Sequence, residues 1–208
     1  MLDQQIQQHF IDSADLKYQS AQALSLPIAS AIQALVASIT GGGKILACGT
    51  GASASQAQMF AGLCVSGFER DRPELAAVAL TSDSGYLGTI AGTPSLSNHY
   101  LARQVRSLGQ AGDVLLVISI TGNETCLLDA VEAAHERDMM VVALTGHTGG
   151  ALAGRMRETD TLICVPHERP ARVREVHDLV LNCLCDGVDT QLLGELSLFF
   201  CKLELFYV

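Results

Sequence analysis

Hydroxyl-bearing side chains occur in two loops that each follow a short apolar run. A strand, a loop of small residues and a helix, in that order, direct backbone N–H groups and hydroxyls at an anion. An anionic ligand is therefore the chemistry that these loops favour, although Ser and Thr at such positions also cap helices. The candidate binding residues are Thr50, Gly51, Ala52 and Ser53 in the first loop and Ser119, Thr121 and Glu124 in the second.

The apolar pattern predicts the elements that hold these loops. Strands are expected at 44–48, 74–80, 113–119, 139–144 and 161–165. Helices are expected at 3–20, 27–40, 54–65, 82–91, 98–108, 124–137 and 172–193. Strands that are apolar throughout and mostly followed by helices indicate a parallel sheet covered on both faces. Ligands bind such sheets at the carboxyl ends of the strands, so Ser53 and residues 119–121 are expected to converge.

Composition and charge narrow the class of protein. Hydrophobic residues make up 49% of the 208 residues and charged residues 17%, which is typical of a folded chain with much internal or interfacial surface. The net charge of −9 disfavours direct binding of nucleic acid, because a phosphate backbone needs a basic surface. The first ten residues have no apolar core of signal-peptide length, and no run reaches the roughly 18 apolar residues of a membrane span. The expected location is the cytoplasm.

Three further features concern burial and assembly. The seven cysteines lie mostly in apolar runs and are odd in number, so buried thiols are expected, not a disulfide framework. The two helices before the first strand need a surface to cover them, and a partner subunit is one candidate. The tail 194–208 holds half of the six Phe residues, and it is either a strand that docks on a neighbour or a segment foreign to the natural protein.

Several segments together resemble the SIS (sugar isomerase) domain family, in the branch that holds bacterial phosphoheptose isomerases. The resemblance covers about 5–193, and its segments are KILACGTGASASQAQ, GDVLLVISITGN, VALTG and ARVREVHDLVLNCLCD. It implies a doubly wound, flavodoxin-like αβα sandwich with a five-stranded, mostly parallel sheet and extra N-terminal helices. It also implies one domain at 1–193, in which 1–40 is an oligomerisation segment, and a homotetramer. Within the branch, NCLCD and other segments resemble DiaA, a non-catalytic relative that binds the replication initiator DnaA.

The departures from the enzymes of this branch concern the reacting groups. Those enzymes carry a His and a Glu on the helix after the first loop, and a Gln and a His on the last helix, as metal ligands and as the acid–base pair. The resemblance puts Met59, Leu63, Arg174 and Asn182 at these four positions. Aldose–ketose isomerisation needs a group that takes a proton and one that gives it, and Leu63 can do neither. No metal and no catalytic residue are therefore expected.

The ligand loops also differ from the family pattern. The family's Asn-Gly-Gly-Ser loop corresponds to residues 50–53, and Glu124 replaces a phosphate-contacting Ser. His177 is near the family's second His but at another helical phase, which favours a structural histidine over a catalytic one.

Three functions follow from these observations. The first is a non-catalytic, homotetrameric, DiaA-like factor that binds DnaA, with Leu192 and Leu193 as partner-contact candidates or as tetramer contacts. The alternative is a phosphoheptose isomerase that converts sedoheptulose 7-phosphate to D-glycero-D-manno-heptose 7-phosphate for lipopolysaccharide synthesis, with zinc as its metal. The third is a sensor that binds a sugar phosphate, which changes its assembly or its affinity for a partner.

Overall fold

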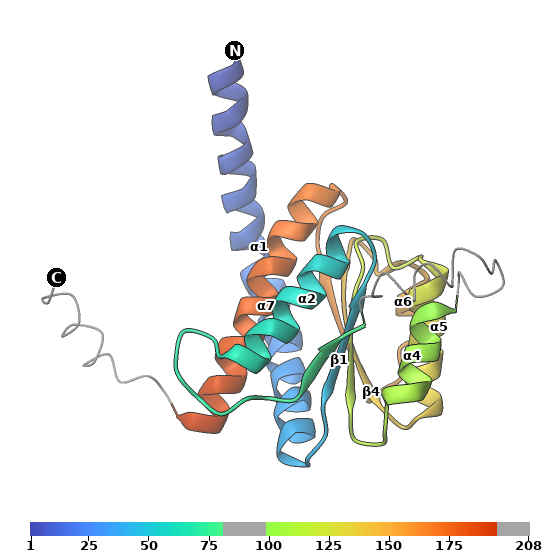
Figure 1. The fold of residues 1–208 in the computed structure, drawn as a ribbon. Helices are drawn as coiled ribbons and strands as arrows, with labels where there is room; N and C mark the ends of the chain where they lie inside the picture. Colours follow the sequence, from blue (N-terminus) through green and yellow to red (C-terminus); the bar gives the residue numbers. More distant parts are fainter. Residues whose placement is uncertain (81–98, 195–208) are drawn as a thin grey trace, which may run out of the picture.

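The computed structural model describes residues 1–80 and 99–194, and its core is a single parallel sheet (Figure 1). The strand order is β2-β1-β3-β4-β5. The strands are β1 (Ile45–Gly49), β2 (Ala77–Ala79), β3 (Val114–Ile118), β4 (Met140–Gly146) and β5 (Thr161–Val165). The helices are α1 (Leu2–Thr40), α2 (Ala52–Ser66), α4 (Tyr100–Leu108), α5 (Thr125–Glu136), α6 (Gly150–Ala153) and α7 (Pro170–Leu193).

The strands alternate their side chains between two helical layers. Ile45 of β1 and Val114 of β3 pack in one apolar cluster with α1, α2 and α7. Leu46 and Leu115 pack in a second cluster with α4, α5 and α6 on the opposite face. Both faces of the central strands β1, β3 and β4 are buried, which explains why these strands are almost entirely apolar. The predicted doubly wound αβα sandwich is confirmed, and β1 lies between β2 and β3, where the strand order reverses.

Helix α1 is one continuous helix, so the prediction of separate helices at 3–20 and 27–40 was wrong. Pro27 lies inside it, although a proline removes one backbone hydrogen bond and usually ends or kinks a helix. Buried side chains continue on both sides of this position, with Leu24 before it and Leu35 after it. Packing of this stripe against α7 and β5 outweighs the local cost of the proline.

The N-terminal end of α1 extends beyond the rest of the chain (Figure 1). Its apolar side chains are exposed there, with Phe10 at 75%, Ile11 at 52% and Leu2 at 71%. By length and composition alone α1 passes the criteria for a membrane-spanning helix, a test that core helices of soluble proteins and signal sequences also pass. These exposed apolar side chains are consistent with the predicted oligomerisation segment at 1–40, which stays a prediction.

The remaining boundaries shift by a few residues at most. Helix α7 begins at Pro170, two residues before the predicted start. Proline suits the first turn of a helix, because the N–H that it lacks would have no partner there. The strand expected at 74–80 is shorter in the structure, where only β2 forms. The short helix α6 was not predicted. The helix expected at 82–91 and the tail after residue 194 lie outside the described residues.

Candidate functional site

The second ligand loop, residues 119–124, lies at the carboxyl end of β3 and is closed on itself. Ser119 is buried, and its Oγ accepts a hydrogen bond from the backbone N–H of Gly122 at 2.7 Å. The same hydroxyl donates to Oε2 of Glu124 at 2.5 Å. Thr121 Oγ1 donates to Oε1 of Glu124 at 3.1 Å. Both oxygens of one carboxylate are therefore held by the two hydroxyls that the sequence identified as ligand donors.

Glycines let this loop lie directly against the start of α6. Gly122 has φ +69°, and a Cβ built there would come within 1.9 Å of the carbonyl oxygen of Gly149. Asn123 fixes the same contact from its side chain, since its Oδ1 accepts the backbone N–H of Ala151 at 2.9 Å. The loop is thus anchored to α6 as well as to β3, which limits how its hydroxyls move.

The first ligand loop joins β1 to α2 and meets the end of β3. A Cβ on Gly49 would lie 2.6 Å from the carbonyl oxygen of Ser53 and 2.9 Å from that of Ile118, so the three segments meet where only a glycine fits. Ser53 is buried in the first turn of α2, and Gly51 before it has φ +55°. Because β1 and β3 are hydrogen-bonded neighbours, both loops leave the sheet at the same edge, and the convergence of Ser53 with residues 119–121 stays a prediction. The remaining loop candidates, Thr50 and Ala52, are half-buried and exposed respectively.

The four positions that the resemblance assigns to the reacting groups lie elsewhere, on the contacting helices α2 and α7. Met59 is 38% exposed, Asn182 is exposed, and Leu63 and Arg174 are half-buried. A thioether, an aliphatic chain, a guanidinium and an amide offer none of the His, Cys or carboxylate ligands that zinc prefers. Among the described residues, no group of three or more His, Cys, Asp and Glu side chains could hold a metal ion. These residues do not fit a zinc site.

A polar contact joins α2 and α7 beside these positions. Gln56 Nε2 donates to Asp178 Oδ1 at 2.7 Å and to the backbone carbonyl of Arg174 at 3.1 Å. Asp178 is one helical turn from both Arg174 and Asn182, so it brings a carboxylate to this helix face. Gln56 and Asp178 were not predicted from the sequence, although their spacing from Met59 and Arg174 would have indicated them.

His177 has a structural environment. The residue is fully buried on α7, and its Nε2 lies 3.1 Å from the carbonyl oxygen of Thr145 at the end of β4. Burial disfavours the charged imidazolium and lowers the pKa of His177 to about 4. The ring is therefore neutral near pH 7, and the interpretation of His177 as a structural histidine is consistent with this geometry.

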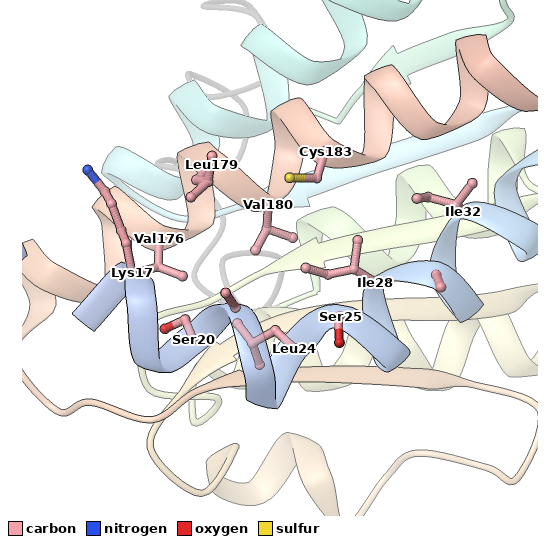
Figure 2. A pocket seen from close by; sticks show the side chains of 12 residues that line it. Lys17, Ser20, Leu24, Ser25, Ile28, Ile32, Val176, Leu179, Val180 and Cys183 are labelled. Carbon is pink, nitrogen blue, oxygen red and sulfur yellow. The ribbon is translucent and has the colours of Figure 1, made fainter. Parts of the chain in front are cut away.

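An apolar groove runs between α1 and α7, away from both ligand loops (Figure 2). Ile28 and Ile32 of α1 face Val180 and Cys183 of α7 across it, and Lys17 lies near one end (Figure 2). Such a lining suits an apolar side chain better than a sugar phosphate. At the end of α7, Leu192 packs against the core cluster and Leu193 is 47% exposed, so only Leu193 offers the surface predicted for a partner.

Comparison with known proteins assigns the chain to a family. The SIS domain profile matches residues 9–146. A phosphoheptose isomerase of Methylibium petroleiphilum is 56% identical over 198 residues, which cover 95% of this chain and 98% of that protein. The structure of the phosphoheptose isomerase from Neisseria gonorrhoeae is 42% identical with a TM-score of 0.85, covering 91% of this chain and 100% of that one. The structure of a phosphoheptose isomerase from Francisella tularensis is 38% identical with a TM-score of 0.87, covering 91% of this chain and 99% of that one.

These relatives correct the finer prediction about the branch. NCLCD and neighbouring segments were interpreted as nearest to DiaA, yet the named relatives at 56% and 42% identity are phosphoheptose isomerases. Short shared segments decided the prediction, whereas the similarity over almost the whole chain favours the isomerases. This chain belongs to the SIS domain family, as a homologue of the phosphoheptose isomerases.

Proposed function

We propose that this chain is a phosphoheptose isomerase, converting sedoheptulose 7-phosphate to D-glycero-D-manno-heptose 7-phosphate. The observation that carries the proposal is the 56% identity to a protein of that name over 98% of its length. The two hydroxyl-bearing loops at the reversal of strand order support it, because this is where open α/β sheets bind their ligands. A charged sugar phosphate does not cross membranes freely, so the proposed location is the cytoplasm.

The reaction that we propose does not depend on zinc. It moves one proton between adjacent carbons of the sugar and needs a group that accepts that proton and returns it. Among the described residues of the two candidate regions, Glu124 of the second loop and Asp178 of α7 carry the carboxylates that could take this role. Met59 and Leu63 contribute shape and apolar surface only.

A second candidate function is a non-catalytic phosphosugar sensor, which the side chains at Met59, Leu63, Arg174 and Asn182 favour. Each general acid–base group that is lost typically costs about 10²–10⁴-fold in rate. A protein that keeps the binding loops without those groups would report a ligand through assembly or stability. The comparisons give no support to DnaA binding over these two functions.

One pair of measurements separates the two functions. Turnover of sedoheptulose 7-phosphate is assayed with zinc and with a chelator, and thermal unfolding is followed with the same sugar phosphate. Product formation that is unaffected by the chelator supports the isomerase. A rise in unfolding temperature without product supports the sensor, because a ligand that binds only the folded state stabilises it by mass action. If neither occurs at millimolar ligand, both proposals fail.

The assembly that we propose is a homotetramer built on α1. The exposed stripe that includes Phe10 and Ile11, and the groove shown in Figure 2, are two apolar surfaces on this helix. Their burial in an interface would remove apolar area from water, which is the main driving force of such assemblies. Light scattering on the full chain gives the oligomeric state, and a monomer at micromolar concentration would contradict the proposal.

A further inference from the structure

Both side-chain hydroxyls of the loop at residues 119–124, and two of its backbone N–H groups, already make hydrogen bonds inside the loop. The hydroxyls of Ser119 and Thr121 each donate to a different oxygen of Glu124, at 2.5 and 3.1 Å. A hydroxyl has one proton to donate, so neither can donate to a ligand while these bonds exist. Two backbone N–H groups are committed as well, that of Gly122 to Ser119 Oγ and that of Asn123 to Thr121 Oγ1.

The Glu124 carboxylate lies in the loop as a bound anion would, with similar charge and shape. A carboxylate presents two acceptor oxygens in a plane, and here each oxygen meets one hydroxyl, as two oxygens of a phosphate would. A second anion at the same hydroxyls would lie within a few ångströms of the first, and like charges at that distance repel strongly where burial limits solvent screening. Ser119 is 1% exposed, so this end of the loop is such a place.

We infer that Glu124 is an internal competitor for the phosphate of the ligand, and that a phosphorylated sugar binds this loop only when the Glu124 carboxylate leaves both hydroxyls. This inference deepens the proposed function, on which it rests for the identity of the sugar phosphate. Glu124 thereby sets the affinity of the loop for phosphate. Its side chain accepts the hydrogen bonds of the two hydroxyls when no ligand is bound, and an anion must bind strongly enough to displace it. Neutral ligands do not meet the charge repulsion.

The test measures binding of inorganic phosphate and of sedoheptulose 7-phosphate to the full chain and to two variants. Glu124→Gln keeps the length of the side chain and removes its charge, and Glu124→Ser removes the competitor and adds a hydroxyl. The expected result is phosphate binding at least about tenfold tighter in E124Q than in the unchanged chain, and tighter still in E124S. Glu158→Gln is the matched control, because Glu158 is an exposed carboxylate outside this loop.

Ser119→Ala in the E124Q background checks that the gain arises at this loop, and it should return phosphate affinity to the level of the unchanged chain. The inference is overturned if E124Q and E124S bind phosphate no more tightly than the unchanged chain, or if E158Q produces the same gain. Circular dichroism of each variant establishes that it is folded, and E124S serves as the test if E124Q is not. If phosphate binding responds as expected while no form turns over sedoheptulose 7-phosphate, the proposed reaction fails and this inference stands.

Discussion

Arg72 and Asp189 form an ion pair in which both side chains are almost completely buried. Arg72 Nε lies 2.6 Å from Asp189 Oδ1, and the side chains are 2% and 1% exposed. The guanidinium also donates to the backbone carbonyls of Leu63 and Cys64 in the last turn of α2, which accept the N–H groups of Gly67 and Leu75 as well. One side chain thus caps α2 and ties it to α7, while Gln56 ties the same helices near their other ends.

Replacing Arg72 with Met is expected to destabilise the fold by about 3–5 kcal/mol, because it leaves the Asp189 carboxylate buried without its partner. Urea unfolding should show a lower midpoint with an unchanged slope. The control is Arg106→Ala, which breaks the exposed pair with Glu136 and should cost no more than about 1 kcal/mol. The double variant R72M/D189L should recover much of the loss, and equal losses for R72M and R106A would contradict the assignment.

Gly122→Ala is expected to destabilise the fold by about 2–4 kcal/mol and to weaken ligand binding. Positive φ alone costs a non-glycine residue about 1–2 kcal/mol, and the added Cβ would also collide with the carbonyl oxygen of Gly149. Gly42→Ala is the matched control, since Gly42 has φ +80° but a Cβ there meets nothing within 4 Å. The free energy of unfolding of G42A gives the cost of the positive φ alone, and the additional loss in G122A gives the cost of the steric clash. Equal losses in the two variants would show that the structure around Gly122 accommodates the added Cβ without cost.

The fold was predictable because its signals are local. Strands buried on both faces are apolar throughout, as at 114–118. An apolar run of that length is typical of a buried strand and is too short for a typical helix. Pro27 is the instructive error, since the usual effect of proline on a helix was outweighed by packing that involves residues more than a hundred positions away. No local pattern contains that information.

The site was predictable only in part, for the same reason. Strand adjacency brings together the loops of Ser53 and Ser119, and the sequence indicated both. That Glu124 turns back onto Ser119 and Thr121 depends on rotamers of neighbouring side chains, which spacing does not specify. The groove between α1 and α7 depends on the continuity of α1 past Pro27, so the error at that residue concealed it.

The buried imidazole of His177 should make stability depend on pH between about 4 and 6.5. The folded state holds the pKa of His177 at about 4, below the ordinary 6.5, because burial disfavours the charged ring. As pH falls through 6.5 the unfolded chain takes up a proton that the folded chain refuses, so the free energy of unfolding decreases until pH approaches 4. The two pKa values differ by about 2.5 units, so at roughly 1.4 kcal/mol per pH unit this amounts to at most about 3.5 kcal/mol.

His177→Gln should remove this part of the pH dependence, because a neutral amide can still donate to Thr145 without a titratable group. Urea unfolding at a series of pH values measures the slope for the variant and for His147→Gln, whose histidine is 60% exposed. The slope should flatten in H177Q and persist in H147Q. A slope unchanged in H177Q would mean that other groups cause the pH dependence.

Substituting the enzymes' four side chains at positions 59, 63, 174 and 182 together should create a metal site on α2 and α7, where the residues present do not fit one. Met59 and Leu63 are four residues apart on α2, and Arg174 and Asn182 are two turns apart on α7, so each pair shares one helix face. The variant M59H/L63E/R174Q/N182H supplies two imidazoles, a carboxylate and an amide on contacting helices, and two imidazoles with a carboxylate are a ligand set that zinc accepts.

This four-residue variant should bind about one zinc per subunit and raise the rate of sedoheptulose 7-phosphate isomerisation at least about 10²-fold, as expected when an acid–base group is regained. Elemental analysis gives the zinc content and a coupled assay the rate, with M59H/R174Q/N182H as the control that keeps Leu63 and so lacks the carboxylate. If the four-residue variant folds and takes up zinc without gaining rate, the α2–α7 face is not where this chain would perform the reaction.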